Sequence, residues 1–212
     1  MINKAIKSIE NSIEYNEPFK HWEIDDFFES TLIKNILKLD IPTGPNGYES
    51  RDVDDDSERA FITEDFVTKY PDFEDVVDIF TDDNFKSTLE KKYNINLKNY
   101  PKLRMEYMQD LDEFYIKPHT DELVKAITIV IYFTDDKRYV DSLGTELYVN
   151  ENKEGVKKVP FKPNKGIIFV PDGESTWHGF SKSNFDIIRR SIIINYVTDE
   201  WRDIHQLLKG GK

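Results

Sequence analysis

The sequence predicts a mainly β domain that is supported by helices near its N-terminus. Three observations carry this prediction: alternating apolar and polar residues in short segments after residue 103, helical spacing of apolar residues before residue 100, and a length of 212 residues with 13% aromatics that suits one sizeable core. Because no helical period separates the strand segments, the favoured architecture is an antiparallel sandwich or barrel.

The first hundred residues are expected to form helical support and loop. Residues 24–39 carry apolar residues at helical spacing, and Asp25 or Asp26 could cap the start of this helix. A second helical stretch covers residues 64–93 and is expected to be interrupted at Pro71, because proline lacks the amide hydrogen that a helix interior requires. We expect a single domain over residues 1–212.

The β core is expected in residues 101–201. Leu103, Met105 and Tyr107 alternate with polar residues, which is the pattern of a half-buried strand. Turn-forming Asp, Asn and Gly residues separate the later segments. The further predicted strands cover residues 113–118, 126–134, 145–149, 158–161, 166–170 and 191–197.

Composition excludes several classes of function. The chain has 29 Lys and Arg residues against 41 Asp and Glu residues, so its net charge of −12 disfavours nucleic acid as a partner. It has no cysteine, which excludes disulfides, thiolate metal ligands and thiol nucleophiles. No apolar run approaches the length of a membrane span, and the N-terminus lacks the pattern of a signal peptide, so we expect a cytoplasmic protein without membrane contact. The oligomeric state is not predicted.

An acidic segment over residues 41–59 is expected to be a solvated or substrate-covering loop. Its aspartates match the first positions of an EF-hand calcium loop, but Ser57 and Thr63 stand where that loop needs Gly and Glu. A calcium site is therefore not expected.

Two of the four histidines have contexts that suit metal binding. His119 and Asp121 stand at i and i+2 as a strand ends, so both side chains can reach one ion, and His178 follows a later strand and turn. Two imidazoles and one carboxylate suit Fe(II), because they leave adjacent coordination positions open; Zn(II) or Mn(II) could use the same set. His21 and His205 have no second ligand nearby, and we expect structural roles for both.

An arginine lies at the start of the last predicted strand. Arg189 and Ser191 share a face of that strand, so a guanidinium and a hydroxyl could together bind the far carboxylate of a dicarboxylic acid. The alternation sends Arg190 to the opposite face, where we expect it to be a solvent-facing arginine.

In these residues the chain resembles the 2-oxoglutarate and Fe(II)-dependent oxygenases, especially their prolyl-hydroxylase-like branch. The resemblance covers residues 103–201, and it departs from the family pattern at Asp112-Glu113, where many relatives have a glycine turn, and at Gly144-Thr145, where Gly-Gly is commoner. Five elements carry it: His119-x-Asp121, Gly144-Thr145-Glu146-Leu147, Gly166-Ile167-Ile168-Phe169, His178 and Arg189-x-Ser191.

The resemblance implies a double-stranded β-helix, the jelly roll of cupin-like proteins. It also implies that His119, Asp121 and His178 hold Fe(II), that 2-oxoglutarate chelates this iron, and that Arg189 pairs with the 5-carboxylate. The implied reaction hydroxylates a substrate with O2 and converts 2-oxoglutarate to succinate and CO2, with ascorbate as a candidate reductant. No catalytic side chain beyond the metal ligands is implied, and Asp121 argues against halogenation, whereas desaturation or cyclisation stays open.

The resemblance extends to two tyrosines and to candidate substrate contacts. Tyr132 and Tyr107 are candidates for the cosubstrate pocket, although each could equally be an aromatic residue of the sheet core. A small-molecule substrate is favoured over a protein side chain. The candidate substrate contacts, each of which has a structural alternative, are Arg104, Lys117, Glu122 and Trp177.

Two other function classes remain open from the sequence. One is a cupin-like metal enzyme that needs no 2-oxoglutarate, and the other is a non-catalytic jelly-roll binding module. The cupin-like enzyme would form no succinate from 2-oxoglutarate, whereas the oxygenase would. The binding module would contain no stoichiometric metal after purification, whereas both enzymes would.

Overall fold

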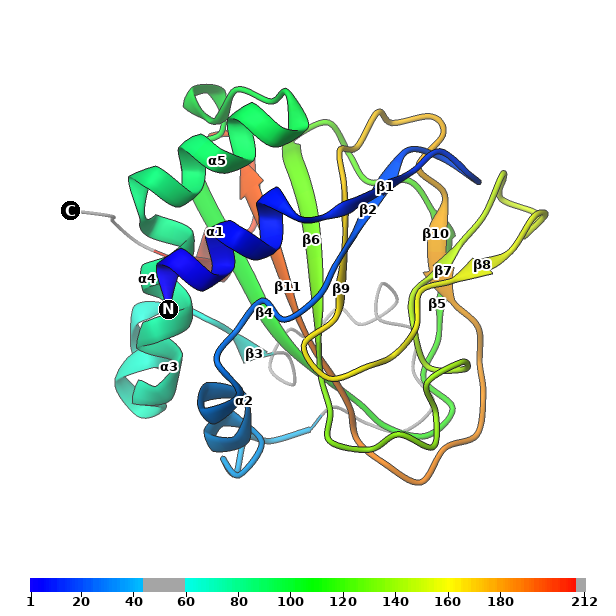
Figure 1. The fold of residues 1–212 in the computed structure, drawn as a ribbon, viewed down its shortest axis with the longest axis horizontal. Helices are drawn as coiled ribbons and strands as arrows, with labels where there is room; N and C mark the ends of the chain where they lie inside the picture. Colours follow the sequence, from blue (N-terminus) through cyan, green and yellow to red (C-terminus); the bar gives the residue numbers. More distant parts are fainter. Residues whose placement is uncertain (44–59, 209–212) are drawn as a thin grey trace.

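Two antiparallel sheets face each other, and a layer of helices covers the outer side of the larger sheet (Figure 1). The computed structural model describes residues 1–43 and 60–208. Two sheets that enclose a common interior in this way form a double-stranded β-helix, or jelly roll. The predicted fold class is therefore confirmed.

The larger sheet has the strand order β1 (Ile13–Tyr15), β2 (His21–Ile24), β9 (Gly166–Phe169), β6 (Lys125–Phe133), β11 (Arg189–Val197), β4 (Lys102–Asp110) and β12 (Leu207–Leu208), with β3 (Ala60–Phe61) also beside β4. The smaller sheet has the order β5 (Ile116–His119), β10 (His178–Phe180), β7 (Glu146–Leu147) and β8 (Lys157–Lys158). The helices are α1 (Ile2–Glu10), α2 (Ser30–Ile36), α3 (Glu64–Lys69), α4 (Glu74–Thr81) and α5 (Asp83–Tyr93), and short 3₁₀ turns cover Pro71–Phe73, Leu97–Asn99 and Ile204–Gln206.

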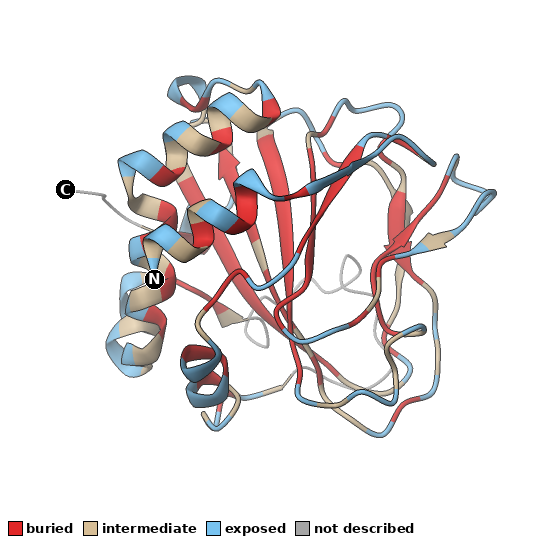
Figure 2. Cartoon of the chain, in the orientation of Figure 1, coloured by how far each residue is buried: buried red, intermediate tan, exposed pale blue. Residues whose placement is uncertain are grey.

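The three long strands β4, β6 and β11 divide the interior into two cores. Their side chains alternate between faces, so that Met105, Ile129 and Ile194 pack toward the helices, whereas Met108 and Val130 lie between the two sheets. Figure 2 shows these central strands as almost continuously buried. The helices thus cover one face of the larger sheet and leave its other face to form the wall of an internal site.

Two glycines allow the strands to approach closely. A Cβ atom on Gly144 would lie 1.5 Å from the carbonyl oxygen of Val159, and one on Gly166 would lie 2.3 Å from the carbonyl oxygen of Val130. Neither backbone position has room for a side chain. These contacts give a physical reason for the glycines that begin two of the motifs in the sequence.

The first predicted helix was placed too early. Residues 21–24 form β2, because their backbone pairs with Gly166–Ile168 in the larger sheet, and the helix begins only at Ser30. Its N-cap residue is Glu29, so the caps predicted at Asp25 or Asp26 are wrong.

The second helical stretch is interrupted at Pro71, as predicted, because α3 ends at Lys69. It is interrupted again at Asp82, whose carboxylate accepts a hydrogen bond from the amide of Phe85 at 2.9 Å and caps α5. The acidic loop predicted over residues 41–59 lies outside the described residues from position 44 onward. Within the described part of the chain, no helix has the length and apolar character that a membrane span requires.

Two buried tyrosines in the core between helices and sheet give a test of this packing. The hydroxyl of Tyr196 donates a hydrogen bond to the carbonyl of Phe80 at 2.6 Å, whereas the hydroxyl of Tyr107 has no partner among the described residues. Because an unpaired buried hydroxyl is unfavourable, Tyr107→Phe should raise the free energy of unfolding by about 1 kcal/mol, and Tyr196→Phe should lower it by about 1 kcal/mol. Urea denaturation measures both values, and a loss of stability in Tyr107→Phe would contradict this packing.

Candidate metal centre

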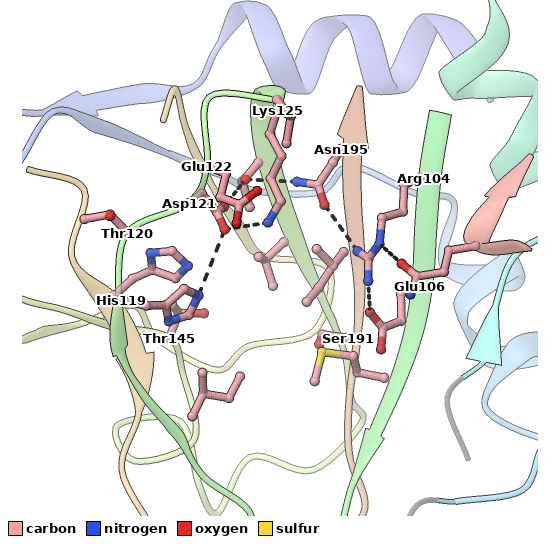
Figure 3. A pocket seen from close by; sticks show the side chains of 18 of the residues that line it. Arg104, Glu106, His119, Thr120, Asp121, Glu122, Lys125, Thr145, Ser191 and Asn195 are labelled. Atoms are coloured by element: carbon pink, nitrogen blue, oxygen red, sulfur yellow. Dashed lines mark hydrogen bonds and ion pairs between the residues drawn. The ribbon is translucent and has the colours of Figure 1, made fainter. Parts of the chain in front are cut away.

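The pairing of β5 with β10 brings two histidines together. His119 lies directly opposite His178 in this antiparallel register, and the centroids of the two rings are 4.2 Å apart. Asp121 follows His119 by two residues, where the chain turns toward β6. One possible ligand atom from each of the three side chains lies within 4.8 Å of the other two. Figure 3 shows His119 and Asp121 on this side of the pocket.

The hydrogen bonds of both rings fit metal ligation. Nδ1 of His119 lies 2.9 Å from the carbonyl oxygen of Lys117, and Nδ1 of His178 lies 2.9 Å from that of Thr176. A carbonyl oxygen only accepts hydrogen bonds, so Nδ1 carries a proton in each ring and Nε2 is the nitrogen left to bind a metal ion. Histidines that bind metals use this arrangement, which fixes the tautomer and the orientation of the ring.

Asp121 is held as a buried carboxylate. Lys125 and Thr128 each place a donor atom 2.5 Å from one of its two oxygens. Burial by itself raises the pKa of this carboxyl group, but Lys125, His178 and Thr128 together lower the pKa well below its ordinary value. Asp121 is therefore ionised at neutral pH, as a metal ligand must be.

The three residues line a cavity of about 820 Å³ that is partly open to solvent, and this volume is within the range of small-molecule sites. Inward-facing residues of β11 form part of its wall, from Arg189 at one end to Asn195 at the other. Six residues of extended chain cover about 20 Å, so the two ends of this wall are well separated. The cavity can hold one ligand at each end.

The end of the cavity at Arg189 is suited to a carboxylate. The guanidinium donates from Nε to the carbonyl of Leu143 at 2.7 Å and from Nη1 to Asp110, and the ring of Phe180 lies 4.4 Å from its central carbon. Nη2 makes no hydrogen bond within the described part of the chain. Ser191 is only 1% exposed, and its hydroxyl has no partner among the described residues. A carboxylate could accept hydrogen bonds from both groups.

The two tyrosines predicted for the cosubstrate pocket lie on different faces of the larger sheet. Tyr132 is buried between the sheets opposite Ser191, and its hydroxyl already donates to Thr145 Oγ1 and accepts from the Thr145 amide, both at 2.8 Å. Tyr107 instead packs against Phe73 among the helices, with ring centroids 5.2 Å apart. The expectation that Tyr107 reaches the pocket is corrected, because strand alternation sends its side chain to the opposite face.

Of the predicted substrate contacts, Arg104 and Glu122 line the cavity, whereas Lys117 and Trp177 do not. Lys117 is exposed and contributes its carbonyl to His119, and Trp177 is half-buried beside His178. Other polar residues that line the cavity or bind its charged groups were not predicted from the sequence. Gln206 lies in a short 3₁₀ turn and had no signal. For the other residues the only signal was a polar residue within an otherwise apolar strand: Glu106, Asp110, Lys125, Thr128 and Asn195.

Fold and site together define a jelly-roll protein with a candidate centre of two histidines and one carboxylate. No protein-family model matches the sequence, and no curated protein matches it. Solved structures do match its fold. They include prolyl hydroxylases, in agreement with the resemblance found in the motifs.

A prolyl hydroxylase from Trichoplax adhaerens, solved with a peptide of hypoxia inducible factor, has a TM-score of 0.57 and 17% identity over 94% of this chain and 90% of its own. A Pseudomonas putida prolyl-4-hydroxylase has a TM-score of 0.52 and 9% identity over 94% and 92% of the two chains. The non-heme alpha ketoglutarate dependent epimerase SnoN from nogalamycin biosynthesis has a TM-score of 0.54 and 8% identity over 100% and 91%. At these identities the likeness shows a shared fold.

The candidate centre predicts a defined pattern of metal binding. His178→Ala and Asp121→Ala should each weaken Mn(II) binding by about 100-fold or more, because each removes one of three protein ligands. His205→Ala is the matched control, since His205 is exposed and lies outside the group. Titration followed by electron paramagnetic resonance measures the affinities, and unchanged binding in both ligand variants would exclude this centre.

Proposed function

We propose that the protein is an Fe(II)- and 2-oxoglutarate-dependent oxygenase that hydroxylates a substrate bound in the cavity. In this reaction one oxygen atom of O2 enters a C–H bond of the substrate, and the other enters succinate as 2-oxoglutarate loses CO2. The observation that supports it best is the position of the His119, Asp121 and His178 group in the same cavity as Arg189 and Ser191.

The residues that line the cavity fit Fe(II) and 2-oxoglutarate. His119 and His178 would bind iron through Nε2, Asp121 would bind it through a carboxylate oxygen, and the backbone contacts of both rings already hold the required tautomer. When bound, iron and 2-oxoglutarate would allow O2 to oxidise the substrate. Three protein ligands leave positions for a chelating cosubstrate and for oxygen.

The protein itself would bind, orient and shield the cosubstrate. Arg189 and Ser191 would hold its far carboxylate, and the contacts of Arg189 with Asp110 and Leu143 restrict how the guanidinium can turn. Phe180 and Ile193 also line the cavity and add apolar surface near this end. An apolar wall around a charged contact excludes water and strengthens that contact.

One observation favours a second candidate, a cupin-like metal enzyme that does not use 2-oxoglutarate. Asp110 already forms a buried ion pair with Arg189, so a second carboxylate would share the guanidinium with an existing anion. The two candidates differ in product, because only the oxygenase makes succinate from 2-oxoglutarate.

The direct experiment combines anaerobic protein with Fe(II) and then with 2-oxoglutarate. The proposal expects a weak visible absorption band when the cosubstrate chelates the iron, and succinate after air is admitted. A metal-loaded protein that shows neither would support the second candidate. Wild-type protein and the Asp121→Ala variant should be compared, since the variant should show neither signal.

Substitutions at the far carboxylate site give a separate prediction. Ser191→Ala should weaken 2-oxoglutarate binding about 10-fold, because it removes one hydrogen bond to a charged group, and it should leave Mn(II) affinity unchanged. Arg189→Lys keeps the charge beside Asp110 but loses the planar donor set, so a larger loss is expected. Arg190→Ala is the control, since Arg190 lies on the other face and bonds Gln109.

Arg189→Ala is a poor test by itself. It would leave the buried carboxylate of Asp110 without its cation, at a cost of about 3–5 kcal/mol in stability. Isothermal titration with 2-oxoglutarate on the Mn(II)-loaded variants measures the affinities. Equal affinity in wild type, Ser191→Ala and Arg189→Lys would show that the anchor lies elsewhere.

A further inference from the structure

The end of the cavity opposite Arg189 contains a second buried arginine, which is held in place on several sides. Arg104 donates from Nε to Gln206 at 2.9 Å, from Nη1 to Asn195 at 3.3 Å and from Nη2 to Glu106 at 2.7 Å (Figure 3). The rings of Phe61 and Trp201 lie 5.1 and 5.3 Å from its central carbon. We call Arg104, Glu106, Asn195, Trp201 and Gln206 the Arg104 subsite.

This arrangement does not suit an anionic ligand. A bidentate contact with a carboxylate or phosphate needs two parallel N–H groups from one edge of a guanidinium. Each nitrogen of Arg104 directs one N–H group to a neighbouring side chain, so that at least three of its five donors are occupied, and the charge of Arg104 is balanced by Glu106, which is 3% exposed. An anion at this end would have to displace Glu106 from a buried ion pair.

The charges of the described residues that line the cavity favour the same conclusion. Among the described residues that line it, five are acidic and four are basic. The charges of Fe(II) and of 2-oxoglutarate cancel each other, so binding both leaves no surplus positive charge for an anionic substrate. An electrically neutral substrate fits this balance best.

The Arg104 subsite is nevertheless strongly polar. Glu106, Asn195 and Gln206 are all at most 3% exposed and present planar polar groups, and Nε1 of Trp201 is buried without a partner among the described residues. A purely apolar substrate would leave this indole N–H unpaired, at a cost. Hydroxyl groups both donate and accept hydrogen bonds without carrying charge, so they match such surroundings.

The Arg104 subsite is joined to the metal centre by a chain of hydrogen bonds. Asn195 lies between Arg104 and Thr128 in the sheet register, and its Nδ2 donates to Thr128 Oγ1 at 2.9 Å. Thr128 in turn donates to Asp121. A ligand that contacts Asn195 is therefore only a few ångströms from the proposed ligands of the iron.

We propose that the Arg104 subsite binds the substrate of the enzyme and that this substrate is a neutral polyhydroxylated molecule, a saccharide. The inference rests on the proposed function, because it takes the Arg189 end as the place of 2-oxoglutarate. The indole N–H of Trp201 donates to one hydroxyl of the saccharide, and the side-chain oxygen of Asn195, which has a second lone pair, accepts a hydrogen bond from another.

The test is ligand-observed NMR on protein loaded with Zn(II) and 2-oxoglutarate, which keeps the site closed-shell and inert. The probes are methyl glycosides of common hexoses and pentoses and their short oligosaccharides, compared with sugar phosphates, free amino acids and a proline-containing peptide. Saturation transfer to at least one neutral saccharide, with none to the other classes, is expected. Transfer only to an anion, an amino acid or the peptide, or to no probe at all, would overturn the proposal.

Two variants locate the binding. Trp201→Phe keeps an aromatic ring beside Arg104 but removes the indole N–H, so saccharide affinity should fall about 2- to 10-fold. Trp177→Phe is the matched control, because Trp177 does not line the cavity. Glu106→Gln removes the anion beside Arg104, so neutral saccharides should bind less well and sugar phosphates better. Equal saccharide binding in wild type and Trp201→Phe would place the ligand elsewhere.

Failure of this inference can be told apart from failure of the proposed function. If the visible band and succinate appear but no saccharide binds, the oxygenase proposal stands and the Arg104 subsite has another role. If a saccharide binds at Trp201 but no succinate forms, the substrate class stands and the use of 2-oxoglutarate fails.

Discussion

The register between β5 and β10 is the constraint on which the candidate site depends. It places His119 opposite His178, and a slip of one residue would turn one imidazole to the other face of the smaller sheet. These strands are too short to fix their own register, so the packing between the two sheets must contribute, including the contact between Phe114 and Phe180. The metal centre is thus a product of the jelly-roll core.

The wall opposite the histidines is an apolar strand with polar residues at alternate positions. Arg189, Ser191 and Asn195 on β11 face the cavity, and the register sets Arg189 beside Asp110 on β4 and Asn195 between Arg104 on β4 and Thr128 on β6. Buried ion pairs are weak contributors to stability, because desolvation offsets much of their attraction. Two such pairs, Arg189 with Asp110 and Arg104 with Glu106, at the two ends of one cavity are therefore better explained by ligand binding than by folding.

The sequence was sufficient to predict what depends on local pattern. Alternation located the strand after Leu103, turn-forming residues separated the later strands, and the motif around His119 named residues that the structure brings together. The strand at residues 21–24 was missed, because its pairing with β9 is long-range and its last residue, Ile24, begins the segment with helical spacing. Lys125, Thr128 and Asn195 were missed because a polar residue in a strand usually faces solvent, and only the fold turns these three inward. The partner of Arg189, Asp110, lies 79 residues away and has no local signal.

The most direct test of the central claim is a crystal structure of the protein with Mn(II) and 2-oxoglutarate, grown without oxygen. We predict one metal ion bound by His119, Asp121 and His178, with the far carboxylate of 2-oxoglutarate against Arg189 and Ser191. We also predict that the Arg104 end keeps room for a second ligand. A metal ion bound by other residues, or a far carboxylate against Arg104, would contradict the account.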